Sequence, residues 1–337
     1  MGDSFSDFGR LPDGEPVERV RIAQGGLSAN ILTYGALVQD LRIEGHPLPL
    51  VLGFSTLDDY LAHSPYFGAT PGRFSNRIGH GRFELDGVFH QLDLNQNGEH
   101  HLHGGAKGFG KRNWRITDRS ERSVRLELDS PEGEMGYPGN CRAVTIYEIG
   151  DGGVLSVRHE TTTDAPTVTN LTHHSYFNLD GRDTILDHEL MLAAEAYLPT
   201  AQGQIPTGEI ADVEGTPFDF RDMRAIRHVL NDAQVDYDHN FCLSREATPK
   251  RTVGLLRSLY SGISLELRTT EPGVQFYCGF KINTPRGLTG VSYGAYAGLC
   301  LEAQIWPDAP NRPDFPNAVL RPGDVRVQET DYVFTRS

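Results

Sequence analysis

Apolar and polar residues alternate along most of the chain in short runs that end at turn-forming residues. Strict alternation over four to eight residues is typical of a half-buried β-strand. Such runs cover residues 17–22, 29–32, 36–43, 123–128, 142–149, 154–163, 188–197, 263–269 and 274–278. Glycines separate the first three runs, so we expect the chain to open with an antiparallel meander.

Two features refine this pattern in the first hundred residues. The run 82–94 carries Asp86-Gly87 at its centre, which is a strong signal for a tight hairpin. Residues 1–15 show no comparable pattern, and we expect them to form a loose tail. A single domain would then span residues 16–337.

Helical spacing is rare in the sequence. Residues 56–62 are compatible with one or two helical turns, and residues 217–230 are the best candidate for a short helix. In the second segment Met223, Ile226 and Leu230 fall on one helical face, and we expect that face to cover one end of a sheet.

The composition favours an all-β protein. The chain of 337 residues contains 37 glycines and 20 prolines, which suits many turns better than long helices. It has no repeated strand–helix–strand unit and no glycine-rich phosphate fingerprint. The expected fold class is therefore all-β, a single large antiparallel β-sandwich with few short helices.

The net charge and the cysteine spacing limit which partners and which cellular location are expected. The formal net charge of −14 argues against binding to nucleic acid or to an anionic membrane. The sequence shows no signal peptide and no apolar run long enough to span a bilayer, so a cytoplasmic location is the default expectation. The four cysteines form no CxxC pair, which favours reduced thiols over a disulfide framework. The oligomeric state stays open.

The stretch 168–181, VTNLTHHSYFNLDG, departs from the alternating pattern. It sets five hydrogen-bonding side chains beside Tyr176 and Phe177. An ordinary half-buried strand rarely needs two adjacent histidines. We expect one face of this segment to present His174 to a pocket while Phe177 anchors the opposite face.

A second group of histidines, His100, His101 and His103, precedes Gly104-Gly105. Histidine is the commonest transition-metal ligand, so this group is a candidate metal site. No carboxylate stands at a helical or strand spacing that would complete such a site. The sequence therefore favours a protein without a metal.

Other polar groups interrupt the strand pattern. The loop 68–81 carries Arg73, Asn76 and Arg77, and is either a sugar- or anion-binding loop or a solvated turn, with the turn favoured on its residues alone. Glu302 follows an apolar run. A carboxylate at the end of a buried strand is costly unless it is hydrogen-bonded or functional, so Glu302 is a candidate general base, with an edge-strand glutamate as an equal alternative.

Seven short motifs lie in order along the chain: NRI (76–78), LHGG (102–105), NLTHHSYFNL (170–179), TPFDFR (216–221), DHNF (238–241), PGVQFY (272–277) and LEAQIWPDAPN (301–311). Together they resemble the motif series of the aldose 1-epimerases, the galactose mutarotases. The resemblance spans about residues 20–335 and is specific because all seven motifs occur in register.

The resemblance implies a galactose mutarotase-like sandwich with an open cleft for a pyranose. Such a protein interconverts the α and β anomers of a free aldose, for example galactose or glucose, without metal or organic cofactor. By motif, His174 would be the general acid and Glu302 the general base. The residues implied to contact the sugar are Asn76, Arg77, His103, Ser175, Tyr176, Asp238 and Gln275, with Arg73 in an assisting role.

The chemistry requires one base and one acid. Mutarotation removes a proton from the C1 hydroxyl and delivers one to the ring oxygen, so that the C1–O5 bond opens and recloses on the other face. A glutamate with a reference pKa of about 4.3 is ionised at neutral pH, and a histidine near 6.5 needs only a modest upward shift of its pKa to carry the transferable proton.

The chain departs from the family's usual pattern in two places. His173 stands where an asparagine usually precedes the acid histidine, and Gly110 replaces a common acidic residue. The first change could alter the hydrogen bonds around His174.

Two alternative functions stay open: a non-catalytic carbohydrate-binding or sugar-sensing module, and a metal-dependent β-sandwich enzyme. The histidines available to the second are His100, His101, His103, His173 and His174.

Overall fold

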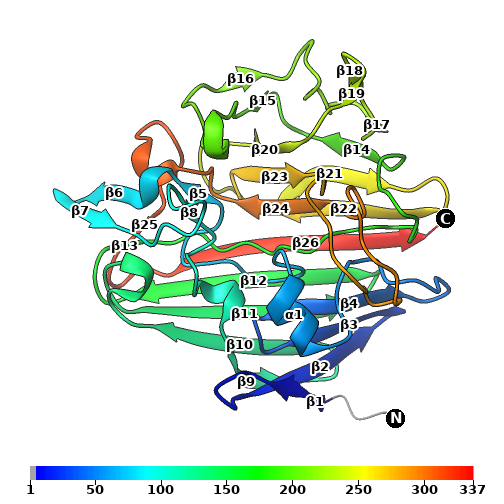
Figure 1. The fold of residues 1–337 in the computed structure, drawn as a ribbon, viewed down its shortest axis with the longest axis horizontal. Coiled ribbons are helices and arrows are strands. Elements are labelled where there is room, and N and C mark those ends of the chain that lie inside the picture. Colours follow the sequence, from blue (N-terminus) through cyan, green and yellow to red (C-terminus); the bar gives the residue numbers. More distant parts are fainter. Residues whose placement is uncertain (1–4, 337) are drawn as a thin grey trace.

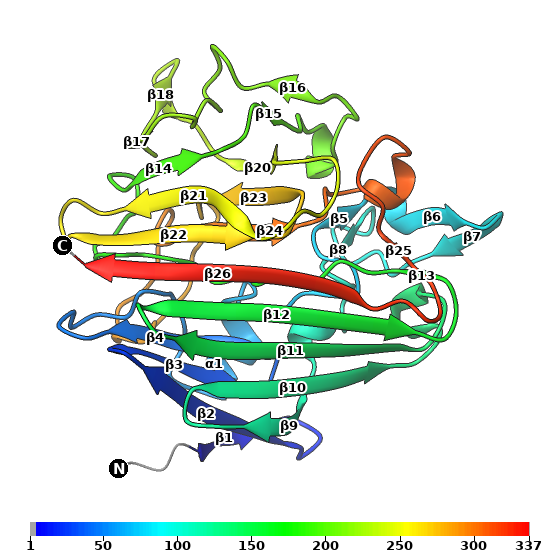
Figure 2. The same ribbon diagram turned by 180° about the vertical axis from the view of Figure 1, so that it is seen from behind.

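The computed structural model describes residues 5–336. Strands dominate it, and α1 (Leu57–His63) is the only α-helix in this described range. The strands form two layers packed face to face (Figures 1 and 2). The expected all-β antiparallel sandwich and the short helix near residue 56 are both confirmed. Within residues 5–336, no helix is long and apolar enough to cross a membrane.

One layer is a nine-stranded sheet whose strand pairs are all antiparallel. Its strands, in spatial order, are β17 (Arg224–Ala225), β14 (Glu189–Leu192), β21 (Arg251–Arg257), β22 (Ile263–Thr269), β26 (Arg326–Arg336), β12 (Val154–Thr163), β11 (Cys141–Gly150), β10 (Ser123–Ser130) and β9 (Arg115–Arg119). The late strand β26 lies in the middle and joins two halves of the sheet (Figure 2).

Two smaller sheets form the other layer. The four-stranded sheet contains β1 (Phe5–Arg10), β2 (Pro16–Gln24), β3 (Leu27–Leu32) and β4 (Leu37–Ile43). The five-stranded sheet runs in the order β16 (Ala211–Asp212), β15 (Ala196–Tyr197), β20 (Asp238–Cys242), β23 (Gly273–Tyr277) and β24 (Cys300–Gln304). Apolar side chains from both sheets pack against the nine-stranded sheet in one continuous core.

Short elements complete the chain. Two-stranded ladders pair β5 (Arg77–Ile78) with β8 (His101–Leu102), β6 (Arg82–Leu85) with β7 (Val88–Gln91), β13 (Thr167–Val168) with β25 (Val319–Leu320), and β18 (Val229–Leu230) with β19 (Ala233–Gln234). The single-turn 3-10 helices are η1 (Gly79–Gly81), η2 (Phe109–Lys111), η3 (Glu134–Gly136), η4 (Gln202–Gln204) and η5 (Ala309–Asn311). The expected opening meander and the hairpin around Asp86-Gly87 are confirmed.

The expectation of a loose tail over residues 1–15 is wrong for the part that the structure describes. Strand β1 pairs with β2, and its two phenylalanines anchor it. Phe5 lies under the guanidinium of Arg119, and Phe8 packs edge-on against Tyr60. Residues 1–4 lie outside the described range. The assignment of the remaining chain to one domain stays a prediction.

The expected helix over residues 217–230 is also wrong. The hydroxyl of Thr216 and the carboxylate of Asp219 accept backbone N–H groups two residues ahead, which favours turns over a helix. Ile226 then extends the backbone along the β14 edge, where its N–H donates to the carbonyl of His188. Leu230 is half exposed, so no apolar helical face exists. Hydrogen bonding to the edge of the sheet therefore prevails over the helical spacing of the apolar residues in this segment.

The segment 168–181 lies between the two smaller sheets. Isolated bridges join Phe177 to Val51 and Leu299, and join His174 to Ala69. The Phe177 ring contacts Tyr332 of the nine-stranded sheet, whereas His174 lies on the opposite face of the segment. The predicted anchoring by Phe177 is confirmed, and the presentation of His174 to a pocket stays a prediction.

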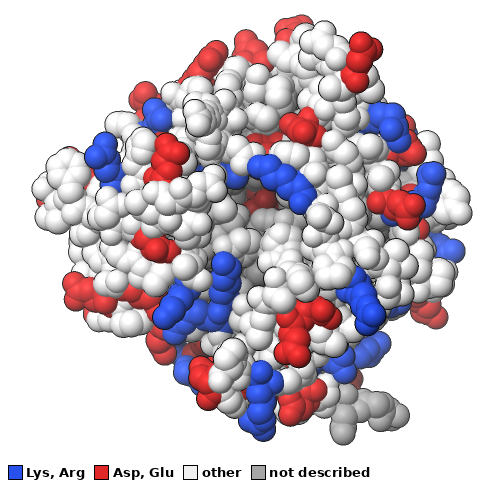
Figure 3. Space-filling model, in the orientation of Figure 1, with Lys and Arg blue, Asp and Glu red and all other residues white. Residues whose placement is uncertain are grey.

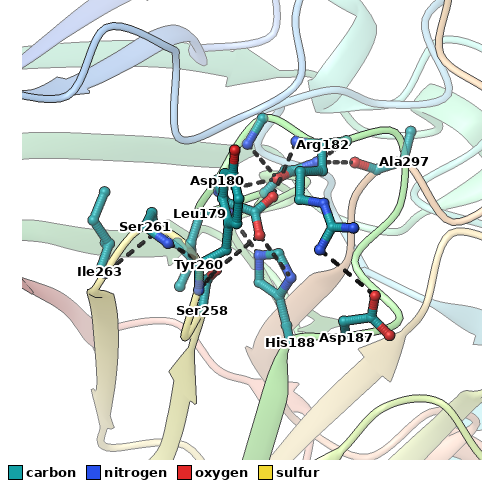
Figure 4. A network of polar contacts seen from close by, with 12 residues as sticks. Leu179, Asp180, Arg182, Asp187, His188, Ser258, Tyr260, Ser261, Ile263 and Ala297 are labelled. Atoms are coloured by element: carbon teal, nitrogen blue, oxygen red, sulfur yellow. Dashed lines mark hydrogen bonds and ion pairs between the residues drawn. The ribbon is translucent and has the colours of Figure 1, made fainter.

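A buried polar network fixes the end of this segment (Figure 4). Asp180 accepts a hydrogen bond of 2.7 Å from the hydroxyl of Ser258, and His188 accepts the backbone N–H of Leu179 through Nε2. Nδ1 of His188 faces the Asp180 carboxylate at 3.9 Å. Because Ser258 bonds to the aspartate and not to the histidine, the trio serves as a clamp and has no nucleophile geometry.

The alternation of β23 predicts a large difference between two phenylalanine truncations. Phe276 is fully buried in the core, whereas Phe89 at the hairpin tip is 76% exposed. We expect Phe276→Ala to lower the free energy of unfolding by about 3–5 kcal/mol, because it removes apolar contacts and leaves a cavity. Phe89→Ala should change it by about 0.5 kcal/mol or less. Urea denaturation measures both, and equal losses would contradict the assigned core.

Candidate active site

The polar floor of the site comes from one face of the five-stranded sheet. Strand pairing sets Asn240, Gln275 and Glu302 side by side across β20, β23 and β24. Paired residues point to the same side of a sheet, and neighbours along a strand point to the other. Phe241 and Phe276 therefore enter the core, while the three polar side chains face away from it.

His174 meets this floor from the segment 168–181. Its Nε2 lies 3.5 Å from Oε2 of Glu302, and both side chains are almost fully buried. The rings of Tyr66 and Tyr176 stack on the imidazole at centroid distances of 5.9 and 5.2 Å. On the other ring nitrogen, Nδ1 lies 3.4 Å from the sulfur of Cys300. These contacts fix the plane of the imidazole and point Nε2 at the carboxylate.

His103 approaches the pair from the LHGG turn. The backbone N–H of Asn76 donates to its Nδ1 at 3.1 Å, and its ring packs edge-on against His174. Since Nδ1 accepts a hydrogen bond, the neutral ring carries its proton on Nε2. The next residue must be glycine, because a Cβ on Gly104 would lie 1.6 Å from the carbonyl oxygen of Gly72. The turn thus presents a neutral N–H donor.

Beyond Glu302, a charged network extends across the floor. Oδ1 of Asp238 accepts from the amide of Gln275 at 2.7 Å, and Oδ2 lies 3.4 Å from Nη2 of Arg77. Nη1 of Arg77 donates to the side-chain oxygen of Asn76 at 3.3 Å. Donors and acceptors therefore alternate over the distance that one small polar ligand would cover.

Burial dominates the protonation of the central pair. It raises the pKa of Glu302 well above the usual range, with the Asp238 charge adding to the rise and Arg77 opposing it. It lowers the pKa of His174 to about 4, although the Asp238 charge acts in the other direction. Desolvation thus outweighs the attraction of the Asp238 carboxylate, and the upward shift that a proton donor at neutral pH needs is absent from the free site. The free pair is favoured as a neutral acid beside a neutral imidazole.

The described surface is hollowed above this region. Figure 3 shows a depression near the centre of the face, with acidic atoms visible at its bottom and basic side chains around its rim. In the same orientation, β24 lies behind the depression (Figure 1). A ligand can therefore approach the polar floor from this face.

Comparison with known proteins identifies the family. A family model described as aldose 1-epimerase matches residues 18–333. The chain belongs to the aldose 1-epimerase family. It is 42% identical to the galactose mutarotase of Mus musculus over 336 residues, covering 97% of each chain, and 35% identical to the aldose 1-epimerase of Escherichia coli, covering 96% of each. The protein is accordingly an isomerase that acts on carbohydrates.

Solved structures agree with this assignment. An aldose epimerase homologue from C. elegans superposes with a TM-score of 0.89 at 33% identity, covering 94% of this chain and 98% of its own. Galactose 1-epimerase from Lactobacillus acidophilus gives a TM-score of 0.84 at 28% identity, covering 99% and 98%. This chain thus shares its fold with both of these solved structures.

Most residues expected from the epimerase motifs converge on one place. The structure brings seven of them together: Asn76, Arg77, His103, His174, Asp238, Gln275 and Glu302. Tyr176 contributes its ring, while its hydroxyl donates to the carbonyl of Pro65. Ser175 follows His174 and is buried without a hydrogen-bond partner for its hydroxyl. Tyr176 thus supports the His174 ring, and a sugar contact through Tyr176 or Ser175 stays a prediction.

Arg73 faces a different region. Its guanidinium donates to both oxygen atoms of Ser130 and to the carbonyls of Pro131, Pro138 and Gly139. All three guanidinium nitrogens therefore donate to the 130–139 loop and hold it against the sandwich. The assisting sugar contact expected from the motif is not supported, because a guanidinium so committed has no donor left for a ligand.

His173 also faces away from the site. It lies between the rings of Tyr147 and Tyr332 in the core, and its Nδ1 is 3.3 Å from the hydroxyl of Tyr147. Burial lowers its pKa to about 3, so the ring is neutral. No hydrogen bond described for residues 5–336 joins it to His174. The departure from the family's asparagine therefore falls on the anchoring face.

Sequence reasoning missed three contributors. Tyr66 packs on both His103 and His174, Cys300 contacts Nδ1 of His174, and Gln204 bonds to Asp238. Cys300 could have been found, because it precedes Glu302 by two residues on the same strand and so shares its face. The other two lie in loops outside the motifs, where no periodicity indicates direction.

The donor chemistry of the histidines bears on the metal-dependent alternative. Two groups place their nitrogen and oxygen atoms within 4.8 Å of one another: His103, His174 and Glu302, and His80, Glu99 and His100. In each group a buried histidine accepts a backbone N–H through Nδ1, His103 from Asn76 and His100 from His80. Its proton then sits on Nε2, which leaves no lone pair for a cation there. Both groups suit hydrogen bonding better than metal ligation.

The burial of His174 predicts a low titration point. We expect its ring to stay neutral from pH 8 to pH 5 and to gain a proton only near pH 4. Two-dimensional ¹⁵N NMR of the imidazole measures this directly, with the urea-unfolded chain, expected near 6.5, as reference. Between these values the unfolded state binds more protons, so this group's contribution to stability falls as the pH decreases. A folded-state pKa of 6.5 or above would contradict the desolvated site.

The position of Arg73 predicts a stability effect without a binding effect. Lysine has a single ammonium in place of a planar fork, so Arg73→Lys would leave several buried carbonyls without donors. We expect it to lower the free energy of unfolding by about 2–4 kcal/mol while the sugar KM of the folded protein stays unchanged. The exposed Arg82→Lys should be close to neutral in urea denaturation. If Arg73→Lys raised the sugar KM without lowering the free energy of unfolding, Arg73 would have to be assigned to the sugar site instead.

Proposed function

We propose that this enzyme interconverts the α and β anomers of a free aldose, such as galactose or glucose, with Glu302 as the general base and His174 as the general acid. The observation that carries the proposal is the facing pair itself, with Nε2 of His174 3.5 Å from Oε2 of Glu302. Each group can reach one of two neighbouring atoms of a pyranose, the C1 hydroxyl and the ring oxygen.

The reaction balances within the pair. The Glu302 carboxylate takes the proton of the C1 hydroxyl, the C1–O5 bond breaks, and the His174 imidazolium gives its Nε2 proton to O5. The product is the open-chain aldehyde. After rotation about C1–C2, O5 attacks the other face of C1, O5 returns its proton to His174, and Glu302 returns its proton to the new C1 hydroxyl. General acid and base catalysis each contribute roughly 10²–10⁴-fold in rate.

The buried resting state fits this cycle. The neutral pair and the reactive carboxylate–imidazolium pair contain the same single proton, so transfer across the 3.5 Å gap interconverts them without exchange with solvent. Sugar hydroxyls that donate to Glu302 would stabilise its charged form, because hydrogen bonds to a carboxylate lower its pKa. Substrate binding would thereby shift the pair toward the reactive form.

Unpartnered polar atoms indicate where the sugar is held. Oε2 of Glu302 and Oε1 of Gln275 are buried and have no hydrogen-bond donor in the described structure. Nε2–H of His103 supplies a neutral donor beside them, and Asp238 and Arg77 supply charged partners further out. Sugar hydroxyls both donate and accept, so one pyranose could satisfy the set. The chemistry requires neither a metal nor an organic cofactor.

Glu302→Gln and His174→Asn test the assignment. Glu302→Gln keeps the size of the side chain, whereas His174→Asn shortens it. Each removes one proton-transfer group, so we expect the catalysed rate to fall by about 10²-fold or more in both. Polarimetry of freshly dissolved α-galactose and α-glucose follows the rate, and far-UV circular dichroism checks the fold. The Arg82→Lys variant serves as the surface control.

Three outcomes are informative. Unchanged rates in both variants would refute the assigned pair. Sugar binding by the wild type with no acceleration over buffer would favour the non-catalytic carbohydrate-binding alternative. Loss of activity after dialysis against EDTA, restored by a transition metal, would favour the metal-dependent alternative.

A further inference from the structure

The turn η4 brings Gln204 into the charged part of the floor from outside all seven motifs. Its Nε2 donates to Oδ2 of Asp238 at 2.5 Å, and its Oε1 accepts from Nη2 of Arg77 at 2.6 Å. Gln204 therefore sits between two residues assigned to the sugar. Arg77 and Asp238 contact each other directly only at 3.4 Å, so the glutamine is the closer partner of both.

The turn is held in this position by the same network. Gln96 accepts from Nε of Arg77 and donates to the carbonyl of Gly203. A Cβ on Gly203 would lie 2.4 Å from Nε2 of His100, so the backbone passes as close to that ring as a glycine allows. Gln204 itself adopts a left-handed backbone with φ of 62°, which turns its side chain inward from the loop. Its placement is thus determined by several contacts.

Gln204 and Asp238 each keep some hydrogen-bonding capacity that a ligand could use. Its Oε1 already faces two cations, Arg77 at 2.6 Å and Nζ of Lys281 at 3.4 Å. One hydrogen of its amide nitrogen goes to Asp238, and the second has no acceptor among residues 5–336. Within the same range, Oδ1 of Asp238 accepts only from Gln275 and retains a lone pair. The two residues together offer one donor and one acceptor side by side.

The sheet fixes where this donor–acceptor pair lies relative to the reacting atoms. Glu302 is on β24 and Asp238 is on β20, two strands away. Asp238 pairs with Tyr277, which pairs with Cys300, so Asp238 is also displaced from Glu302 by two residues along the strands. With about 4.8 Å between strands and a rise of about 3.4 Å per residue, the two backbone positions are about 12 Å apart. A pyranose with C1 and O5 at Glu302 and His174 would direct its opposite edge, which carries the C4 hydroxyl, toward Asp238 and Gln204.

We propose that Gln204 is a specificity-determining residue that reads the hydroxyl on the sugar edge opposite C1. The hydroxyl donates to Oδ1 of Asp238 and accepts the free N–H of Gln204. The inference rests on the proposed function, because it uses the assigned orientation of the sugar. Galactose and glucose differ only in the direction of the C4 hydroxyl. A hydrogen-bond donor at this point therefore gives the two sugars different binding free energies.

Gln204→Leu removes the donor with little change in side-chain size, and Gln202→Leu makes the same change at an exposed position of the same turn. We expect Gln204→Leu to raise KM about 10-fold for at least one of the two hexoses and to change the galactose-to-glucose ratio of kcat/KM at least about 5-fold. The kcat values should stay within about 3-fold, because the acid–base pair is untouched. Gln202→Leu should match the wild type.

A purely structural role predicts a different result. It would lower kcat or the melting temperature with both sugars affected equally, and an unchanged sugar ratio in folded Gln204→Leu would overturn the proposal. Gln204→Glu, which keeps the shape but offers no N–H, gives a second test if the leucine variant does not fold, and it must alter the same ratio.

Calorimetric binding of galactose and glucose separates failure of this proposal from failure of the proposed function. If the wild type binds both sugars without accelerating mutarotation, the function fails. A changed ratio of the two affinities in Gln204→Leu would still support the assigned reading, and an unchanged ratio would overturn it.

Discussion

The proposed mechanism depends on two ionisable side chains, Glu302 and His174, that are almost fully buried. Removing Glu302 and His174 from solvent disfavours the charged form of each, in opposite directions on the pH scale. Either group alone would be held in its inert neutral form. Facing each other across 3.5 Å, they can become charged together by moving one proton, and the cost of charge is then offset within the pair. In the proposed mechanism, catalysis requires that this pair stay buried and close together.

The fold meets both conditions through simple alternation. Strands β20, β23 and β24 send Phe241, Phe276 and Leu301 into the core and polar groups to the other face, so Glu302 rests on a rigid, apolar support. The segment 168–181 repeats the division, with Phe177 inside and His174 outside. Because both partners are fixed by side chains packed in one core, their separation is set by the sandwich and not by a flexible loop.

How far the sequence predicts this structure depends on the kind of signal. Alternation predicted most of the strands and the sandwich, and the ordered motifs predicted Glu302 and His174 as a pair, which the structure places 3.5 Å apart. The predictions failed where distant contacts decide: Thr216 and Asp219 turn a helical spacing into a strand edge, and Arg73 is committed to carbonyls that are distant in sequence. The direction of the His174 pKa shift could not be predicted, because burial cannot be read from a motif. Gln204 could not be predicted either, because it lies outside every motif and its partners are distant in sequence.

The central place of β26 has a consequence for the order in which the molecule can form. This strand fills the gap between β12 and β22, yet it is synthesised after both. Until it arrives, the nascent chain exposes two unpaired strand edges, each able to bind a neighbouring chain. Assembly is therefore a late and cooperative event that couples the two halves of the sheet, and the interval before it is when the polypeptide is most exposed to aggregation.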